Sequence, residues 1–306
     1  MEERGKPLVS IITINYNNVS VTGALIESLK KVSYPAVEII VVDNGSSENP
    51  DPLKEQYPFV KLIKTGRNLG FAGGNNEGFK AAGGEYFLML NNDTEVDPHF
   101  IEPLIERLQA DKSIGAVSSM LIYYNSDHII QYAGSTPINR FTGRNKYIGQ
   151  KERDNGQYNH CCPTCYGHGA AMMIPRRVVE EVGLMADLYF LYYEELDFCE
   201  RIRKAGYSIW YSGRSKVYHK ESMSVGKESA LKTYYMTRNR LLFLRRNTKG
   251  LSLASSLAFF TFVSIPKNTI DYIFRKRLDL LKAFFSGYIW NWNNDKIHDN
   301  PKLEKL

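Results

Sequence analysis

Asp93 is the residue whose position in this chain most directly suggests chemistry. It closes the polar triplet Asn91-Asn92-Asp93, which follows the short apolar run Tyr86–Leu90. Such a run is typical of a buried strand, and ligands of open α/β sheets bind beyond the carboxyl ends of the strands. The Asp93 carboxylate is therefore placed to hold a hard cation through oxygen. The same pattern also fits a buried strand that is simply followed by a polar turn and a helix cap. Residues elsewhere in the chain are needed to distinguish a cation site from this structural role.

Three earlier apolar runs also end in polar residues. They are Leu8–Ile14, followed by Asn15 and Asn17, then Val37–Val42, followed by Asp43, and Val60–Ile63, followed by Arg67 and Asn68. Helical patterns alternate with these runs, and one short helix is predicted over Asn75–Ala82. This order predicts an α/β fold with a doubly wound, mostly parallel sheet. The strand ends resemble a nucleotide site, but no Gly-x-Gly-x-x-Gly follows the first strand, and the glycine-rich segment Gly66–Gly78 lacks the Lys-Ser/Thr end of a phosphate loop.

The second half of the chain adds further acids and histidines. Glu194 and Glu195 begin a predicted helix, where acids also serve simply to complement the helix dipole. His219 ends the second of two predicted strands, near Ile209–Tyr211 and Lys216–His219, where a hydrogen-bonded surface histidine is the plain alternative to a metal ligand. His168 and Gly169 lie in a Gly-His-Gly turn that either faces a substrate or allows tight packing. The long polar segment 140–166 is interpreted as a mobile flap or a substrate-facing loop.

Composition sets outer limits on function. The 306 residues suffice for one large domain with or without an appendage. The net charge of +6 is too small to indicate nucleic-acid binding. Three of the four cysteines lie in His160–Cys165, but no second ligand pair completes a zinc site, which favours packing or free thiols. No secretory signal is recognised at the N-terminus, so we expect reduced thiols and a cytoplasmic protein, with contact at the inner face of the membrane left open.

Taken in order, these motifs resemble the family 2 glycosyltransferases of the GT-A fold, and the rhamnosyltransferase-like branch is the most similar. The resemblance covers roughly residues 8 to 245. It rests on the segments Ser10–Asn17 (SIITINYN), Val41–Ser47 (VVDNGSS), Arg67–Asn75 (RNLGFAGGN), Leu90–Asp93 (LNND), Tyr192–Gly206 (YYEELDFCERIRKAG) and Val217–His219 (VYH).

The resemblance implies transfer of a sugar from a nucleotide diphosphate donor, with inversion, to a glycan or lipid-linked acceptor. By position, Asp93 and His219 would hold Mg²⁺ or Mn²⁺, and Asn91 and Asn92, where acids could have stood, suggest weak metal binding. The donor-binding residues implied are Asn15, Asn17, Asp43, Arg67, Asn68, Asn75 and Asn92, and those on the acceptor side are His168 and Gly169.

The same resemblance implies a general base among the acids of the second half. Glu195 stands where the family usually has an aspartate, so whether Glu194 or Glu195 is the base stays open. Physical chemistry supports such parts: a divalent cation neutralises a leaving diphosphate, and a positioned carboxylate removes the proton of an attacking hydroxyl.

The C-terminal segment differs in character from the rest. We expect a catalytic domain over 1–245 and a basic, apolar helical segment over 246–306. Ser252–Pro266 is strongly apolar, and the cluster Arg275-Lys276-Arg277 follows it. Contact with a membrane surface is one interpretation, and a helical cap or a dimer interface is the other.

Two competing functions remain at this level. A nucleotidyltransferase would use a similar sheet, metal and acids, but the segment 15–19 offers no lysine or arginine for a phosphate-binding loop. A non-catalytic protein that binds a nucleotide sugar or glycan is kept open by the glutamate at 195. Neither the donor sugar, with rhamnose suggested by the branch, nor the nucleotide base follows from the motifs.

Overall fold

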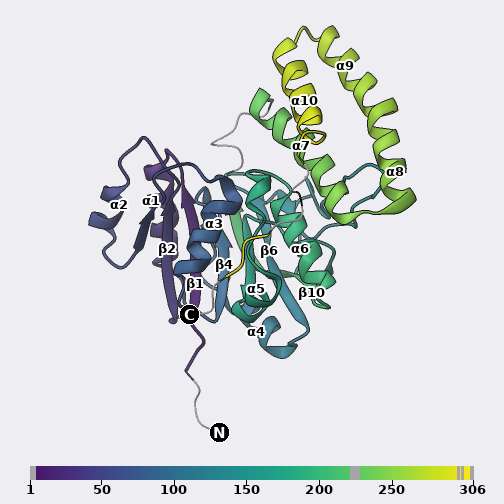
Figure 1. Ribbon diagram of the computed structural model, residues 1–306. Helices are drawn as coiled ribbons and strands as arrows, with labels where there is room; N and C mark the ends of the chain where they lie inside the picture. The colour runs from purple at the N-terminus through teal and green to yellow at the C-terminus, as the bar shows by residue number, and fades with distance from the viewer. Residues whose placement is uncertain (1–4, 221–227, 295–296, 298–299, 304–306) are drawn as a thin grey trace.

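The computed structural model of the chain describes residues 5–220, 228–294, 297 and 300–303. Its centre is a ten-stranded sheet with the order β3-β2-β1-β4-β9-β6-β10-β5, in which β7 also pairs with β6 and β8 with β10 (Figure 1). The strands are β1 (Val9–Asn15), β2 (Val37–Asp43), β3 (Lys61–Lys64), β4 (Tyr86–Leu90), β5 (Thr94–Val96), β6 (Ile114–Tyr123), β7 (Ile130–Tyr132), β8 (Cys161–Thr164), β9 (Ala171–Pro175) and β10 (Ser208–His219).

The main path of the sheet is mostly parallel, as predicted. Strands β1, β2, β3, β4, β6 and β10 share one direction, while β9 and β5 run the opposite way. In the β1–β2 register Asn15 lies opposite Asp43, and Ile12 pairs with Met89 of β4. The polar residues that follow these strands are therefore gathered at one edge of the sheet.

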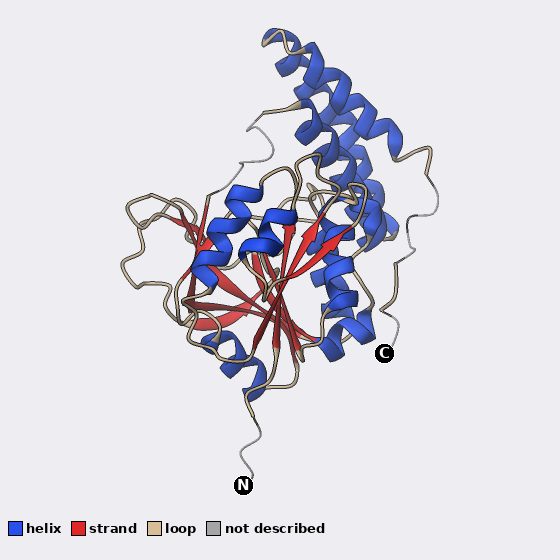
Figure 2. Ribbon diagram, turned by 90° about the vertical axis from the view of Figure 1, so that its left-hand side faces the viewer, coloured by secondary structure: helices blue, strands red, loops and turns tan. Residues whose placement is uncertain are grey.

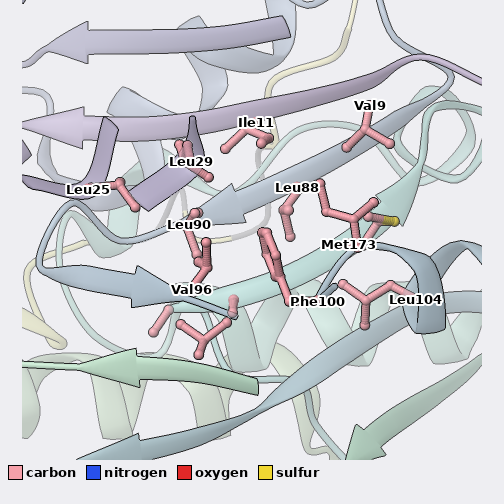
Figure 3. Packing of buried hydrophobic residues seen from close by; sticks show 14 of the residues in the cluster. Val9, Ile11, Leu25, Leu29, Leu88, Leu90, Val96, Phe100, Leu104 and Met173 are labelled. Carbon is pink, nitrogen blue, oxygen red and sulfur yellow. The ribbon is translucent and has the colours of Figure 1, made fainter. Parts of the chain in front are cut away.

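The two faces of the sheet carry separate hydrophobic cores, because successive strand side chains point to opposite faces. Ile11 and Leu88 belong to one core, whereas Ile12 and Phe87 belong to the other. The first core is closed by α1 (Val19–Leu29) and α4 (Glu102–Ala110), and Figure 3 shows Leu25, Leu29 and Leu104 packed there. The second is closed by α3 (Gly70–Ala81), α5 (Arg176–Val182) and α6 (Glu194–Lys204).

Helix α3 corrects the predicted start at Asn75, because the glycine-rich segment is itself helical from Gly70. Its glycines allow close packing on β1. A Cβ on Gly74 would lie 2.9 Å from Ile14 Cδ1, and one on Gly78 would lie 2.2 Å from Ile12 Cγ2. The glycines therefore serve the approach of a helix to a strand rather than a phosphate loop.

The far side of the sheet differs from the prediction at β10. The two strands predicted within 209–219 are one strand with an irregularity between Ser212 and Lys216, so that prediction is wrong. Strands β6 and β7 form an antiparallel pair. Before α4 begins at Glu102, the Asp97 carboxylate accepts the N–H of His99 in a turn. Part of the loop 140–166 is ordered as β8, which pairs with β10.

The C-terminal helices stand beyond one end of the sheet (Figures 1 and 2). They are α7 (Ala230–Asn247), α8 (Gly250–Phe259), the π-helical turn η2 (Phe260–Ser264), α9 (Ile265–Phe274) and α10 (Leu278–Trp290), with α10 packed along α7. The expected domain boundary at 245/246 falls inside α7. Together α8, η2 and α9 form one helix of 25 residues, Gly250–Phe274, which is long and apolar enough to cross a membrane by length and composition alone.

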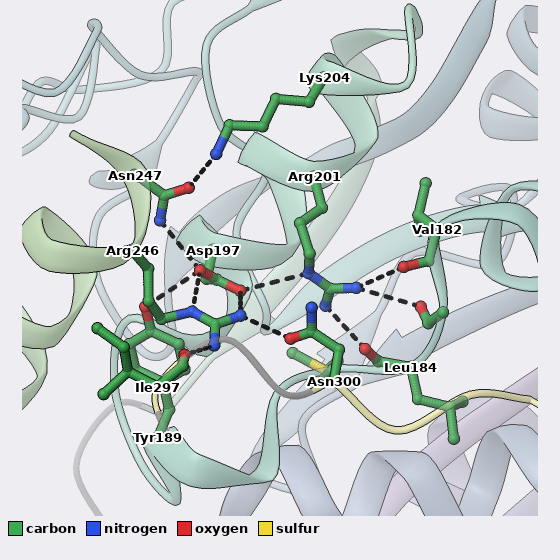
Figure 4. Close-up of polar contacts among 12 residues, drawn as sticks. Val182, Leu184, Tyr189, Asp197, Arg201, Lys204, Arg246, Asn247, Ile297 and Asn300 are labelled. Carbon is green, nitrogen blue, oxygen red and sulfur yellow. Dashed lines mark hydrogen bonds and ion pairs between the residues drawn. The ribbon is translucent and has the colours of Figure 1, made fainter. Parts of the chain in front are cut away.

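A buried ion-pair network ties α7 to α6. The Asp197 carboxylate lies 2.9 Å from Arg246 Nε and 3.3 Å from Arg201 Nε, and it also accepts hydrogen bonds from Asn247 Nδ2 and Tyr189 Oη (Figure 4). These partners hold the pKa of Asp197 below its usual value despite its burial. The network fixes the C-terminal end of α7 to the sheet domain.

Candidate active site

A cavity of about 250 Å³ lies at the edge of the sheet where β1, β2 and β4 end. Its walls come from those strand ends, from the start of α3, from the segment 190–191 and from Leu231 on α7. The residues lining it are Ile14, Tyr16, Asn44, Asn68, Gly70, Phe71, Asn75, Leu90, Asn91, Asn92, Asp93, Phe190, Leu191 and Leu231. The sequence predictions Asn68, Asn75, Asn92 and Asp93 thus meet in one cavity.

Asp93, which lines the cavity, lies beside His219, which is not among the lining residues. The Asp93 Oδ1 and His219 Nε2 atoms are 3.1 Å apart, and both side chains are largely buried. They are far apart in sequence, and the antiparallel pairing of β10 with β5 brings them together, since His219 is opposite Thr94. The Asp93 carbonyl also accepts the N–H of Lys220 at 2.8 Å, which locks the two segments in register.

The surroundings of His219 suit a cation ligand. Its Nδ1 lies 2.7 Å from Gln131 Oε1, and because an amide oxygen only accepts, Nδ1 carries the proton. The Nε2 lone pair then points to a region that also contains Asp93 Oδ1, at 3.1 Å, and Asn91 Nδ2, at 3.4 Å, so Nε2 and the carboxylate can coordinate one cation together. An imidazole oriented by a hydrogen bond on its other nitrogen is the usual arrangement of a metal-binding histidine. The residues present therefore fit a divalent cation held by one carboxylate and one imidazole.

His168 and Gly169 lie next to this pair. The His168 ring centroid is 6.2 Å from that of His219, and its Nδ1 accepts the N–H of Ala170. Burial, together with the neighbouring His219, lowers the pKa of His168 to about 3, so the ring is neutral at physiological pH. A Cβ on Gly169 would lie 3.3 Å from Phe71 Cε1 and 3.7 Å from Glu195 Cβ, so Gly169 connects the cavity wall to Glu195.

Several predicted donor residues form the framework behind the cavity. The buried Asn15 donates to Asp43 Oδ1 at 2.8 Å and accepts from Thr22 Oγ1 at 2.8 Å. Thr22 Oγ1 in turn accepts from Asn92 Nδ2 at 3.0 Å. This chain of hydrogen bonds links the ends of β1, β2 and β4. Asn15 and Asp43 are not among the residues that line the cavity, and their hydrogen bonds hold the strand ends that form its walls.

The loops after β1 and β2 are joined by Asn17, which has a positive φ of 51°. Its Oδ1 accepts the N–H groups of Ser47 and Glu48 at 2.7 and 3.2 Å. Asn44, which the sequence analysis did not select, lines the cavity and ties it to the next loop through Asn68 Oδ1 and the carbonyl of Gly70. Exposed Arg67 stands in the same loop outside the cavity lining.

Glu194 and Glu195 begin α6 without the cationic partners that Asp197 has. Glu194 is 3% exposed, and its Oε2 has no hydrogen-bond partner among the described residues. Burial and the charge of Glu195 raise the pKa of Glu194, and burial raises the pKa of Glu195 to about 7. A carboxylate with such a pKa is deprotonated readily near neutrality and takes up a proton in turn, which suits a general base.

The segment that leads into α6 is held in an unusual conformation. Phe190, Tyr192 and Tyr193 have φ values of 63°, 70° and 73°, which are rare for aromatic residues. Asn239 of α7 maintains this conformation, because its Nδ2 donates to the carbonyls of Tyr189, Leu191 and Tyr192 at 2.7–2.8 Å. Strain of this kind concentrates at functional sites. Helix α7 therefore positions the start of α6.

The same segment also meets α3 at Gly70. The N–H of Phe71 donates to the carbonyl of Phe190 at 2.6 Å, and a Cβ on Gly70 would lie 2.2 Å from that oxygen. Gly70 itself has a φ of +73°, so only glycine fits. Sequence reasoning did not select Asn44, Phe71, Gln131 or Asn239 as site residues. Asn44 and Phe71 lie within motifs quoted above, whereas Gln131 and Asn239 act through distant contacts and had no local signal.

Comparisons with known proteins show which family and fold the chain resembles. Residues 10–183 match the family Glycosyl transferase family 2. A relative from Haloferax volcanii, the low-salt glycan biosynthesis hexosyltransferase Agl10, is 28% identical over 76% of this chain and 74% of its own length. The N-acetylglucosaminyl-diphospho-decaprenol L-rhamnosyltransferase of Mycobacterium tuberculosis is 21% identical over 79% of this chain and 86% of its own.

Two solved structures share the fold. GalNAc-T7 with UDP, GalNAc and Mn²⁺ has a TM-score of 0.63 at 17% identity, covering 80% of this chain and 48% of that one. The mannosyltransferase PcManGT from Pyrobaculum calidifontis, with GDP-Man and Mn²⁺, has a TM-score of 0.58 at 14% identity, covering 95% of this chain and 89% of that one.

Proposed function

Because the chain belongs to glycosyl transferase family 2, we propose that it transfers a hexosyl or deoxyhexosyl unit, with rhamnose the first candidate, from a nucleotide diphosphate donor to a hydroxyl of a glycan or lipid-linked acceptor, with inversion. The observation that carries this proposal is the cavity at the strand ends, which is lined by Asp93, with His219 beside that carboxylate, and by Phe71, whose contact with Gly169 leads to Glu195. One region thus offers an anion-compensating site and a proton acceptor, which are the two requirements of an inverting displacement.

Glu195 is the proposed general base. It would take the proton of the acceptor hydroxyl as that oxygen attacks the anomeric carbon, and the bond from that carbon to the diphosphate would break. Its pKa of about 7, raised by burial, leaves a substantial deprotonated fraction at neutral pH. Glu194 is more enclosed, and burial together with the charge of Glu195 raises its pKa, so we assign it no direct part in the proton transfer.

Asp93 and His219 would hold Mg²⁺ or Mn²⁺, with Gln131 orienting the imidazole. When bound, the cation would act as a Lewis acid and compensate the charge of the leaving diphosphate. With two protein ligands, the remaining positions would be left to donor phosphates and water, so we expect weak, exchangeable metal binding. The two similar structures, GalNAc-T7 and PcManGT, are complexes with Mn²⁺.

The donor nucleotide would occupy the cavity between the strand ends and α3. We assign direct contacts to Asn68, Asn75, Asn92 and Asn44, which line the cavity. Asn15, Asn17 and Asp43 would shape its walls, and exposed Arg67 would reach the donor from the rim. His168 and Gly169, beside Glu195, would face the acceptor.

The C-terminal helices would bring the enzyme to an anionic membrane surface at the inner face of the membrane. Leu251, Phe262 and Phe274 are 90%, 77% and 83% exposed on the helix Gly250–Phe274, which is 17% buried over its most apolar stretch. The basic residues Arg275, Lys276 and Arg277 follow at its end. Apolar side chains next to cations suit an interface with anionic lipids.

Donor hydrolysis tests the proposed reaction. Nucleotide diphosphate sugars incubated with the protein and Mn²⁺ or Mg²⁺ should release nucleotide diphosphate, faster with a suitable acceptor. Asp93→Asn should lower this release strongly, while Asp127→Asn, on an exposed surface pair with Arg153, should not. Binding of donors without any release of nucleotide diphosphate would contradict an enzyme and favour a nucleotide-sugar-binding protein.

A further inference from the structure

A second, larger cavity lies between the sheet domain and the C-terminal helices. It has a volume of about 490 Å³, within the range of about 300–1,000 Å³ usual for small-molecule sites. Its walls come from the 144–145 turn, α7, α9 and α10. Its lining includes the basic residues Arg144, Lys232 and Arg240. We call it the anion cavity, because these side chains attract negatively charged groups.

These three cations have no carboxylate partner among the residues that the structure describes. The acids that line the cavity, Glu228 and Asp271, are both engaged by Arg275, with Asp271 Oδ2 at 3.3 Å from its Nη1. Arg275 is thereby compensated, whereas Arg144, Lys232 and Arg240 appear in none of the ion pairs between described residues. The cavity therefore presents an excess of positive charge to whatever enters it.

Arg240 is the strongest sign that an anion belongs there. It is 7% exposed, yet its Nε has no acceptor among the described residues, and its Nη2 reaches only Ser264 Oγ at 3.4 Å. The guanidinium also rests 4.5 Å above the Phe260 ring. A cation removed from water without a charged partner is costly. An anion held in the cavity beside the Arg240 guanidinium would offset that cost.

The position of the cavity connects it to the proposed reaction centre. Tyr193 lines it and directly precedes Glu194 and Glu195 at the start of α6. Lys232 lines it as well, whereas the preceding residue, Leu231, lines the donor cavity. The segment 190–193 and the first turn of α7 are thus walls of both cavities. A ligand anchored by the three cations would lie beside the same segment that carries the proposed base.

The rest of the lining shows what kind of molecule fits. Leu280 and Phe284 of α10 and Met236 of α7 give the cavity an apolar part next to the cations. The helices α9 and α10 that form this wall also carry exposed apolar side chains, including Phe274 and Leu278. The cavity is thus both cationic and apolar, next to the surface assigned above to the membrane.

We propose that the anion cavity binds the phosphate or diphosphate group of a lipid-linked acceptor through Arg144, Lys232 and Arg240. This inference rests on the proposed function and names the acceptor class more closely. The lipid chain would leave along α9 and α10, and the acceptor sugar would extend past Tyr193 toward Glu195. Arginines in planar, hydrogen-bonded contact with phosphate oxygens give the required strength and orientation.

Binding of inorganic pyrophosphate, measured by titration calorimetry in excess EDTA, tests the subsite without turnover. The double variant Arg144→Gln/Lys232→Gln should bind pyrophosphate at least about tenfold more weakly than the unchanged protein, since each lost contact is charge-assisted. Arg240→Lys keeps the charge but loses the fork of donors and should show a smaller weakening. Lys282→Gln on α10 removes an exposed charge outside the cavity lining and should leave the affinity unchanged.

Two further arms separate the sources of the phosphate group. Flotation with phosphatidylglycerol vesicles should be equal for the double variant and the unchanged protein, and the KM for a lipid-linked diphosphate acceptor should rise with kcat largely retained. If pyrophosphate affinity is the same in all variants, the subsite is wrong. If the double variant instead loses vesicle binding and keeps its acceptor KM, the cations belong to lipid headgroups and the acceptor assignment is overturned.

The outcome also separates this inference from the proposed function. If the protein binds pyrophosphate through these cations but transfers no sugar, the proposed function is contradicted and the anion site remains supported. If the protein is an active transferase but its affinity for pyrophosphate is unchanged in the variants of the three cations, only the subsite is contradicted. The variants should keep the fold, because the Arg144 and Lys232 side chains are exposed and half-buried respectively and make no ion pair with a described residue.

Discussion

Asp197 and Glu195 stand in the first turns of the same helix, yet their surroundings have opposite effects. Arg246, Arg201 and Asn247 surround Asp197 and hold its pKa below the usual value. Glu195 gains no cation, and burial raises its pKa to about 7. Both sites are enclosed, so the difference lies in the partners. A buried carboxylate with cationic partners, such as Asp197, stays charged and holds α6 to α7. A buried carboxylate without such partners, such as Glu195, can exchange a proton near neutral pH.

Among variants of these two sites, Glu195→Gln should have the largest effect, and the quantity that changes is kcat. Removing the carboxylate removes the proposed base, and kcat should fall by about 10²- to 10⁴-fold. The matched variant Glu194→Gln should lose less than about tenfold, a factor that marks an indirect contribution. Initial rates of nucleotide diphosphate release measure both. Equal losses in the two variants would leave the base unassigned between them.

Asp197→Asn should act on stability instead. The change leaves Arg246 and Arg201 buried without their counter-charge, and the free energy of unfolding should fall by about 3–5 kcal/mol. Urea unfolding followed by circular dichroism measures this. Asp279→Asn removes an exposed partner of Arg277 and should shift the midpoint little, because exposed ion pairs contribute little. A small change at Asp197 would mean that the network is not a structural anchor.

A smaller effect is expected at Asn239 of α7, whose side chain holds the segment that leads into α6. Asn239→Leu frees three carbonyls of the strained segment before α6, and should cost about 1–3 kcal/mol of stability. Because that segment carries Glu195, kcat should fall by more than the loss of folded protein explains. Asn247→Leu, on the same helix but bonded to Asp197, should lower stability without a separate loss of kcat. Thermal melts and rates on the same samples distinguish the two.

The smallest effect concerns the pH dependence of stability. Burial raises the folded-state pKa of Glu194 above its ordinary value of 4.5, so the favourable neutral form is present below that pH and is lost as pH rises through the raised pKa. Glu194→Gln is neutral at every pH. The variant should therefore be about as stable as the unchanged protein near pH 4 and more stable than it near pH 8, with the free energy of unfolding measured at both pH values. A constant difference across that range would contradict the assigned shift.

Much of the fold could be predicted because it follows from local patterns. Short apolar runs that end in polar residues marked β1, β2 and β4, and the order of the motifs identified the GT-A family 2 glycosyltransferases, a resemblance that the family match confirms. Helix α3 was placed too late because its glycines favour loops in isolation, and only contact with β1 explains them. The irregularity that lets β10 continue past Ser212 likewise depends on its neighbour β6.

The site was predictable only in part for a similar reason. Asp93, Asn68 and Asn75 follow recognisable motifs and do meet in one cavity. Gln131 and Asn239 act through a strand and a helix whose positions only the tertiary structure sets. Arg240 lies outside the resemblance-based assignments, and its missing partner is visible only once burial is known.

Glu195, whose pKa is raised by burial, is the proposed general base. The pH profile of kcat/KM tests this assignment most directly, because that ratio reports ionisations of the free enzyme. We predict a rise of about tenfold per pH unit up to an apparent pKa of about 7, a plateau above it, and loss of this break in Glu195→Gln. A profile that is flat between about pH 5 and pH 8, or a break that persists in Glu195→Gln, would contradict the account.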